Sequence, residues 1–438
     1  MASKSLEGWA CVPYPPPRSV RWRSGIAVLA LLVSAIPAAM AATRELPGAD
    51  VASIRAWLRA GNPELRALTA DSEAAVARIQ PAGVLPDPVV SLGVRNLDPD
   101  RPWQVPGGAR EIGYALRQQV PLWGKRGLAR TAARQGAEAL ALDRDAVARE
   151  IIAEAESAYV RYWHADQGIA VLDRRLALLR QLEEIAGVRY ALGMAPQQDS
   201  IRAQVEQTAM QRERIQRLVQ KQEAAAALNG GMGRSVDAAL APPAQLPDLP
   251  VRSASLEGIL RALQGGRHPA VQAEHARVLA AQTGAELQRR RRYPDLTVGV
   301  GAIQREDGRD SMELMLEVEI PLQQRARRER ERESRLLEEA AQARLDVARQ
   351  LLAREAAASW AQWRGARDRR QLTEQTLLPQ ADAAFQSALA SYQVGDVDFG
   401  TLLEALNQWQ GANLDRVDAL RDELLGAAAV RAIEGGVL

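Results

Sequence analysis

The sequence predicts an internally duplicated α+β membrane protein, and three observations lead to this fold class. Four short segments alternate apolar and polar side chains with a period of two, the pattern of a strand with one apolar and one polar face. Each pair of strands precedes a helical pattern of roughly seventy residues, far longer than helices of compact domains. A proline-ended junction from strand to helix occurs twice, in Glu111–Arg126 and Ser311–Arg325.

Residues 1–41 are expected to form a secretory signal peptide. An apolar run over residues 25–36 is followed by small residues near Ala41, which suits cleavage there. Three arginines form the basic region before this run: Arg18, Arg21 and Arg23. The single cysteine, Cys11, precedes the run, so we expect an exported chain without disulfides or cysteine-ligated metal. A net charge of +2 gives no reason to propose nucleic acid as a partner.

The first structural repeat is predicted over residues 42–230. It opens with a helical stretch over 51–79 that carries Asn62-Pro63. Strands at 89–96 and 111–120 then form the β-hairpin 89–120, and Pro121 ends it because proline cannot donate to a strand ladder. The long helical hairpin 123–228 follows, with helices over 123–192 and 197–228 and a turn at Gly193. Apolar residues spaced by threes and fours give the first of these helices a coiled-coil rhythm.

Residues 231–267 are predicted to be an equatorial linker, because they are rich in glycine and proline. The second repeat, residues 268–438, then restates the first: His268-Pro269 resembles Asn62-Pro63. Its β-hairpin 295–320 has strands at 296–304 and 312–320 and ends at Pro321. Its long helical hairpin 323–433 has helices over 325–392 and 401–433, with a turn at Gly395.

The strand faces suggest a place for the sheet. One face is apolar, and the other carries charged side chains: Arg95, Glu111, Arg117, Glu313, Glu317 and Glu319. Strands of about nine or ten residues suit a tilted transmembrane strand, and barrels in the outer membrane place apolar residues outward. Four strands cannot close a useful barrel, so several copies of the chain must share one. A soluble sheet with its polar face in water stays an alternative.

Taken together, these features resemble the outer-membrane efflux proteins of the TolC family. The resemblance is carried by the duplicated order of elements, by the strand ends QVPLWGKR (119–126) and EIPL (319–322), and by the helix-turn tips around Gly193 and Gly395. It implies a homotrimer with a twelve-stranded barrel in the outer membrane and a helical coiled-coil tunnel across the periplasm. It also implies two protein partners, a periplasmic adaptor and an inner-membrane pump of the RND type.

The resemblance implies a gate at the helix tips, where acidic and tyrosine side chains interlock. Asp199 and Tyr392 match that pattern, and Glu404 falls where the family often has an aspartate. Two positions depart from it, because Val397 replaces a latching arginine and Thr401 replaces a second aspartate. The alternatives are structural: Asp199 as an acid favoured at a helix start, Tyr392 as a packing residue and Glu404 as part of a solvated face.

Two arginine-rich runs, Arg289–Arg292 and Arg325–Arg335, are read as exposed helix faces with Glu/Arg pairs. Contact of the first run with lipid head groups is a further hypothesis. The histidines His164, His268 and His275 form no metal-ligand pattern, and no phosphate-binding glycine loop joins a strand to a helix. No catalytic residue, metal or cofactor is therefore expected.

The expected function is that of a passive export channel. The competing function is that of a soluble periplasmic coiled-coil adaptor or scaffold, which would normally have one helical hairpin where this chain has two. The stretch PLWGKR looks most like branches that accompany heavy-metal and cation pumps, but drug and type I export branches share the architecture, so the cargo stays open.

Overall fold

The computed structural model describes residues 46–97, 109–253, 255–305 and 308–434. The chain divides into two parts, Met1–Glu45 and Leu46–Leu438, and everything below concerns the second part alone. The predicted signal peptide, residues 1–41, lies outside the described residues.

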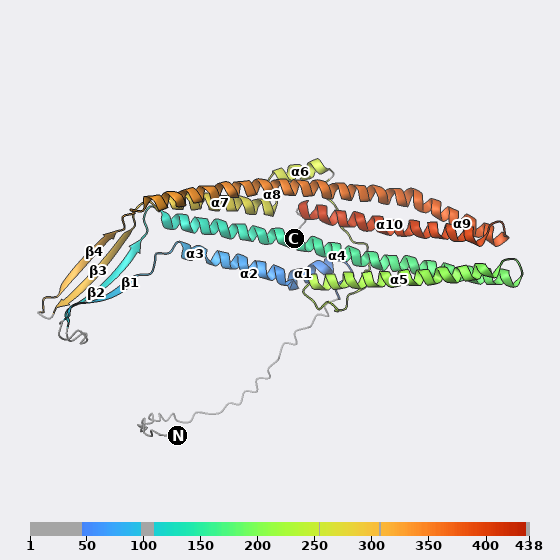
Figure 1. Cartoon of the computed structure of the whole chain (residues 1–438), viewed down its shortest axis with the longest axis horizontal. Coiled ribbons are helices and arrows are strands. Elements are labelled where there is room, and N and C mark those ends of the chain that lie inside the picture. The colour runs from blue at the N-terminus through green and yellow to red at the C-terminus, as the bar shows by residue number, and fades with distance from the viewer. Residues whose placement is uncertain (1–45, 98–108, 254, 306–307, 435–438) are drawn as a thin grey trace, which may run out of the picture. The chain divides into compact units, whose positions relative to one another are not determined.

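The described chain consists of long helices and one four-stranded sheet, as predicted (Figure 1). The first half contains α1 (Val51–Gly61), α2 (Pro63–Ala77), α3 (Ile79–Ala82), β1 (Val89–Leu97), β2 (Ala109–Val120), α4 (Lys125–Ala191) and α5 (Gln197–Gly231). The second half contains α6 (Leu256–Gln264), α7 (Pro269–Arg290), β3 (Leu296–Arg305), β4 (Ser311–Val318), α8 (Gln324–Leu372), the π-helix η1 (Thr373–Leu377), α9 (Leu378–Val394) and α10 (Phe399–Glu434). None of these described helices is both long enough and apolar enough to cross a membrane.

The sheet is antiparallel throughout, in the order β1-β2-β3-β4, so the two sequence hairpins join through β2 and β3. Its register aligns apolar side chains in rows across all four strands. One row is Leu92, Tyr114, Ala302 and Met312, and the next is Val90, Leu116, Val300 and Leu314. The side chains of this apolar sheet face are open to the surroundings: Val90 is 79% exposed and Met312 is 88% exposed.

The opposite sheet face carries the charged side chains. Arg305 lies opposite Glu111 and forms an ion pair with it at 3.3 Å, and Arg117 pairs with Glu317 at 3.5 Å. Strand β4 ends at Val318, two residues before the predicted end at Ile320. Glu319 still donates its backbone N–H to the Asp295 carbonyl at 3.2 Å, and Pro321 follows, where no donor is available.

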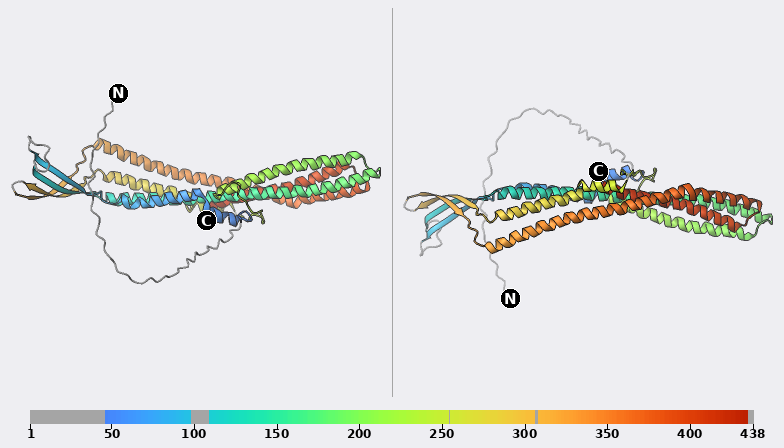
Figure 2. Two further views of the ribbon diagram at one scale, coloured as in Figure 1. Left: turned by 90° about the horizontal axis from the view of Figure 1, so that it is seen from below. Right: turned by 90° about the horizontal axis from the view of Figure 1, so that it is seen from above.

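The helices extend from one end of the sheet. Helix α4 runs the length of the helical part, as do α8, η1 and α9 in succession (Figures 1 and 2). Shorter helices lie end to end beside them: α3, α2 and then α5 pack along α4, while α7 and then α10 pack along α8. Helices α7 and α10 also contact α4, which connects the two halves. Both helical hairpins turn at the end farthest from the sheet.

The same capping device begins the second helix of each half. The Asn62 side chain accepts a hydrogen bond from the Leu65 N–H at 2.8 Å, and His268 Nδ1 accepts one from the Ala270 N–H at 3.3 Å. A proline, Pro63 or Pro269, occupies the first helical position in each case. The prediction of one helix over residues 51–79 is wrong, because a residue before proline prefers an extended backbone and Asn62 adopts it.

The predicted helix over 325–392 is also interrupted, by the π-helical turn Thr373–Leu377. Pro379 follows this turn closely. Proline has no N–H to donate, and its ring clashes with the carbonyl four residues earlier in an α-helix. A widened turn relieves that clash, so the chain continues into α9.

The core lies where the linker wraps the middle of the bundle. Tyr159 of α4 is buried there and donates its hydroxyl to the Ala49 carbonyl at 2.8 Å. The predicted linker 231–267 contains helix α6, which sequence analysis did not foresee. Ser255 caps this helix, and Ile259 is its buried residue. Helix α6 thereby adds an apolar side chain to the core that α1, α4 and α10 share.

We predict that Gly426→Ala destabilises the bundle. Gly426 of α10 lies against α8 so closely that an added Cβ would come within 2.7 Å of the Trp363 Cα, a backbone atom. Overpacking of this kind costs about 1–3 kcal/mol of unfolding free energy. Thermal unfolding followed by circular dichroism in detergent measures the loss.

The matched control is Gly411→Ala in the same helix. An added Cβ at Gly411 meets no atom within 4 Å, and alanine favours a helix over glycine by about 1 kcal/mol. The control should unfold at the same temperature as the unchanged protein or above it. Equal destabilisation by both substitutions would contradict the close-packing argument.

Candidate functional site

The tip turns are built around the two predicted glycines. Gly193 (φ 69°) and Gly395 (φ 92°) both adopt the left-handed backbone that ends many helices. In the first turn the Met194 N–H donates to the Arg189 carbonyl at 2.8 Å, and in the second the Asp396 N–H donates to the Ser391 carbonyl at 2.9 Å. A glycine is therefore required by the backbone at each tip.

Tyr392 is the packing centre of the tips and is only 1% exposed. Its ring packs against Phe399, with 5.5 Å between ring centroids. The Arg189 guanidinium lies over the same ring, 4.6 Å from its centroid, and also donates a hydrogen bond to the Tyr392 carbonyl. Because Arg189 belongs to α4 and Tyr392 to α9, this contact fastens the two helical hairpins of one chain to each other.

Asp199, in the first turn of α5, is buried beside this cluster at 7% exposure. Burial raises the pKa of the Asp199 carboxyl, the positive charge of Arg202 opposes this rise, and the negative charge of Asp398 adds to it. Burial and the neighbouring Asp199 charge also raise the pKa of Tyr392. The buried Tyr392 hydroxyl lies near this carboxylate without the geometry of a well-formed hydrogen bond.

The structure brings two of the three predicted gate residues together and separates the third. Asp199 and Tyr392 meet, whereas Glu404 lies exposed on α10. Val397 packs, partly buried, against the apolar cluster of the tips. At Thr401 the backbone N–H donates to the Asp398 carboxylate at 2.7 Å, which caps α10 and lowers the pKa of Asp398.

Sequence reasoning missed Arg189, Arg202 and Asp398 as members of the tip cluster. Asp398 had a usable signal, because an aspartate just before a predicted helix start is a common N-cap. No sequence signal pointed to Arg189, because its partner Tyr392 lies 203 residues away in the sequence.

The two junctions with Pro121 and Pro321 differ in how firmly they are held. After Pro121, Trp123 and Gly124 both have positive φ, and the Trp123 Nε1–H donates to the Pro294 carbonyl at 2.9 Å. The buried Lys125 ammonium donates to the Asp295 carboxylate and to the Tyr293 carbonyl, each at 2.7 Å. After Pro321, the Gln324 side chain donates to the Pro321 carbonyl at 2.6 Å, and the bond to another element comes from Arg327, which donates to the Arg291 carbonyl.

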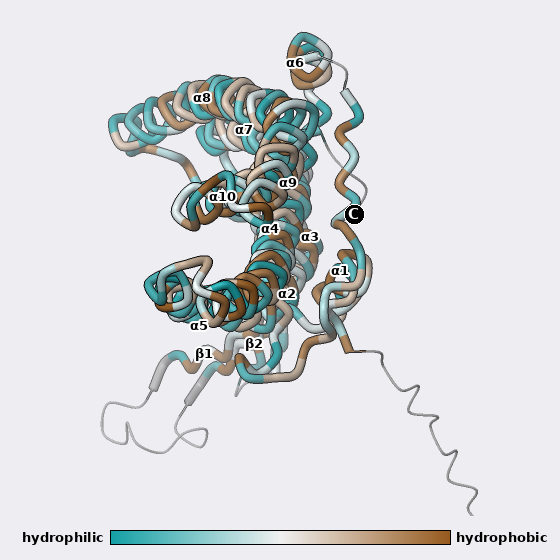
Figure 3. The backbone as a smooth tube through the Cα atoms, turned by 90° about the vertical axis from the view of Figure 1, so that its right-hand side faces the viewer, coloured by the Kyte–Doolittle hydropathy of each residue, from teal (hydrophilic) through white to brown (hydrophobic). Residues whose placement is uncertain are grey.

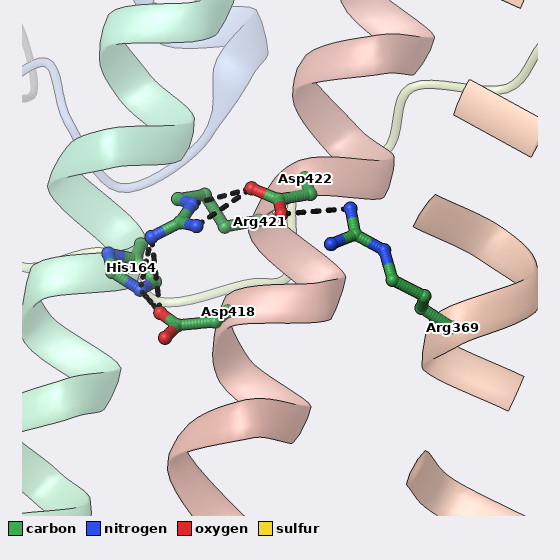
Figure 4. Close-up of polar contacts among 5 residues, drawn as sticks. All are labelled: His164, Arg369, Asp418, Arg421 and Asp422. Atoms are coloured by element: carbon green, nitrogen blue, oxygen red, sulfur yellow. Dashed lines mark hydrogen bonds and ion pairs between the residues drawn. The ribbon is translucent and has the colours of Figure 1, made fainter. Parts of the chain in front are cut away.

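A chain of polar and charged side chains crosses the middle of the bundle (Figure 4). His164 of α4 is buried and lies 2.5 Å from the Asp418 carboxylate of α10. The hydrogen bond with His164 and the charge of Arg421 lower the pKa of Asp418. Arg421 also pairs with Asp422 at 2.8 Å, and Asp422 pairs with Arg369 of α8 at 3.2 Å. These contacts tie three helices together and position no reacting group.

Comparison with known proteins agrees with this geometry. A model of the outer membrane efflux protein family matches residues 261–436. The match covers most of the second half of the chain and leaves the first half unmatched. No curated protein sequence matches the chain.

Solved structures of outer-membrane channels share the fold over both halves of this chain. CusC superposes with a TM-score of 0.75 at 16% identity, covering 90% of this chain and 93% of CusC. VceC of Vibrio cholerae gives 0.74 at 18% identity over 88% of this chain and 96% of VceC. The open state of MtrE from Neisseria gonorrhoeae gives 0.72 at 15% identity over 90% of this chain and 91% of MtrE.

We predict that Asp199→Asn stabilises the tips of the two helical hairpins at neutral pH. A raised carboxyl pKa means that the folded tip binds a proton more tightly than the unfolded chain does. The contribution of Asp199 to stability is therefore complete below the unfolded pKa of about 3.9 and is lost as the pH rises through the folded pKa. An asparagine side chain does not ionise, so the Asp199→Asn protein keeps this contribution to stability as the pH rises.

Hydrogen exchange of tip peptides, compared between about pH 4 and pH 7, measures the effect. In the Asp199→Asn protein the tips should be better protected at the higher pH and should depend less on pH. Glu404→Gln, at an exposed acid of α10, is the control and should behave like the unchanged protein. The interpretation is wrong if both substitutions change protection equally.

Proposed function

We propose that this chain is the outer-membrane channel component of a tripartite efflux system. In this role it is a passive conduit, not an enzyme, and it extends from the outer membrane into the periplasm. The observation that carries the proposal is the apolar sheet face, which no part of the described chain covers. The match of residues 261–436 to the outer membrane efflux protein family supports it. Lipid is the solvent that such a face fits.

The edges of the sheet favour a homotrimer that shares one barrel. Within the described chain, β1 and β4 each pair on one side only, which leaves two unpaired strand edges. Unpaired backbone groups are costly in lipid, so the edges must meet those of other copies. Three copies give twelve strands, and the polar sheet face with its pairs Arg305–Glu111 and Arg117–Glu317 would line the water-filled interior.

The arrangement of the helices favours a tunnel wall that several copies of the chain build together. Seen from the tips, they form a curved layer with α8 and α5 towards its two ends, and not a closed bundle (Figure 3). Apolar side chains remain exposed on both of these helices, among them Val205 and Ile215 of α5 and Leu336 and Val347 of α8. Neighbouring copies would cover these residues and close the wall.

A soluble periplasmic adaptor or scaffold is the competing function, and the sheet argues against it. Large apolar side chains in rows on an open strand face make a water-exposed sheet prone to aggregate. The proposed channel works with a periplasmic adaptor and an inner-membrane pump of the RND type, and the pump supplies the energy. Its cargo is small molecules or metal cations.

The decisive test is electrophoresis of detergent-extracted outer membranes, heated and unheated, with the mass of the unheated species determined. We expect extraction to require detergent and the unheated species to have the mass of three chains. A water-soluble monomer or dimer would overturn the proposal and favour the scaffold.

We propose further that the tip cluster is the periplasmic gate of this channel. The support is the burial of Tyr392 among side chains from three helices at the end farthest from the sheet. Docking of the partners would dilate the tips as two packed hairpins moving together.

Tyr392→Ala should raise the single-channel conductance of the purified trimer in planar bilayers, because it removes the ring on which Arg189 and Phe399 pack. Tyr392→Phe keeps the ring and loses only a hydroxyl without a well-formed hydrogen bond, so its conductance should stay low. Tyr190→Ala, at an exposed tyrosine of the other tip, is the control. Unchanged conductance in Tyr392→Ala would exclude the cluster as the gate.

A further inference from the structure

A cavity of about 410 Å³ lies where the sheet meets the helices. The ends of five elements surround it: the α3–β1 connection, the starts of α4 and α8, the end of α7 and the end of β4. We call this cavity the junction pocket. It lies at the opposite end of the helices from the tip cluster, and the channel function described above does not use it.

The junction pocket is strongly cationic. Arg126, Arg291, Arg327 and Arg330 line it, and none of them forms an ion pair with a carboxylate in the described part of the chain. Two are held by carbonyl groups instead: Arg126 Nε donates to Gly83 at 2.9 Å, and Arg327 Nη1 donates to the Arg291 carbonyl at 2.5 Å. The Nε of Arg327 is buried without an acceptor.

The acids of the junction pocket do not offset these charges. Two carboxylates line it, those of Asp295 and Glu319. Asp295 is engaged by the Lys125 ammonium at 2.7 Å and the Leu122 N–H at 3.0 Å. Four arginines therefore face one uncommitted carboxylate.

Two helix starts add to the positive potential. Helix α4 begins at Lys125 and helix α8 at Gln324, both beside the junction pocket. Neither start has a side-chain cap or an acidic residue in its first turn, so the backbone N–H groups there are not satisfied by the usual carboxylate. A pocket with this arrangement of donors suits a phosphate, since arginine binds phosphate oxygens through paired N–H groups.

The residues next to the junction pocket are those of a membrane interface. Leu322 is 82% exposed and follows the end of the apolar sheet face, with Ile320 also exposed beside it. Trp123 and Tyr293 stack with 5.1 Å between ring centroids at the same level, both exposed. Aromatic side chains followed by arginines mark the boundary between hydrocarbon and head groups.

We propose that the junction pocket binds the phosphate of a phospholipid head group, with Arg126, Arg327 and Arg330 as its ligands and the acyl chains lying along Ile320 and Leu322. The apolar neighbours favour a phospholipid over free phosphate, because free phosphate gains nothing from them. The bound lipid would fill the space between the two strand-to-helix junctions and hold them in register. This inference rests on the outer-membrane location proposed above.

The test uses the full-length protein, delipidated in detergent, with thermal stability as the measurement. Three additions are compared: phosphatidylglycerol, a diacylglycerol with the same acyl chains, and inorganic phosphate. We expect only phosphatidylglycerol to raise the unfolding temperature. The double substitution Arg327→Gln/Arg330→Gln should weaken its apparent affinity about tenfold or more, since two charge-assisted hydrogen bonds are lost.

The matched control is Arg325→Gln/Arg328→Gln, which removes the same charge from the same helix at exposed positions that do not line the junction pocket. It should keep the affinity of the unchanged protein. Equal losses in both double variants would overturn the site in favour of general surface charge. Equal stabilisation by diacylglycerol or by inorganic phosphate would overturn the assignment to a phospholipid head group.

Folding and channel assembly are checked separately, by the mass of the unheated detergent species. If Arg327→Gln/Arg330→Gln fails to assemble, Arg126→Gln provides a second test at a ligand from α4. An unchanged protein that assembles as a trimer but ignores phosphatidylglycerol would refute the lipid site and leave the channel intact. An unchanged protein that is soluble and monomeric would instead refute the channel.

Discussion

The apolar sheet face is the constraint on which the rest of the structure depends. A four-stranded sheet of this kind is prone to aggregate in water, because rows such as Leu92, Tyr114, Ala302 and Met312 have nothing in the described chain to cover them. Its two strand edges need partners for the same reason. Each half contributes one antiparallel hairpin, whose first strand begins and whose second strand ends at the same end of the sheet. The helices therefore leave from that end, and both proline junctions lie there.

The helical part solves a different problem, that of keeping long helices in register. Its two larger apolar clusters lie in the middle and at the tips, and a smaller one joins α7 to α8. Small residues such as Gly426 let α10 approach α8 closely. Between these clusters, ion pairs connect helices at defined heights, as in the chain from His164 through Asp418 and Arg421. Of these side chains only His164 is buried, and the charged side chains that follow it are partly exposed, so each ion pair adds little stability. A shift in register would cost the buried His164 its hydrogen bond to Asp418.

The parts of the fold that sequence alone predicted are those set by local periodicity. Alternation located all four strands because side chains change face at every residue, and the rhythm of threes and fours located the long helices. Breaks set by backbone details were missed: the extended Asn62 before Pro63, and the π-turn before Pro379. At the tips, Tyr392 and Asp199 were identified through family resemblance, while Arg189 was not, because its place depends on how two distant hairpins pack.

Arg189 also changes how the tips are understood. The family resemblance places a latching arginine at the position of Val397, which instead packs with apolar neighbours. In this chain the arginine at the tips is Arg189 of α4, which contacts both the ring and the carbonyl of Tyr392. That contact joins two hairpins within one chain and makes no demand on a neighbouring copy. Each chain's tip is therefore a preassembled unit. In the proposed gate this unit keeps the two hairpins of one chain together, so loss of the Tyr392 ring would loosen the tip without any change in a neighbouring copy.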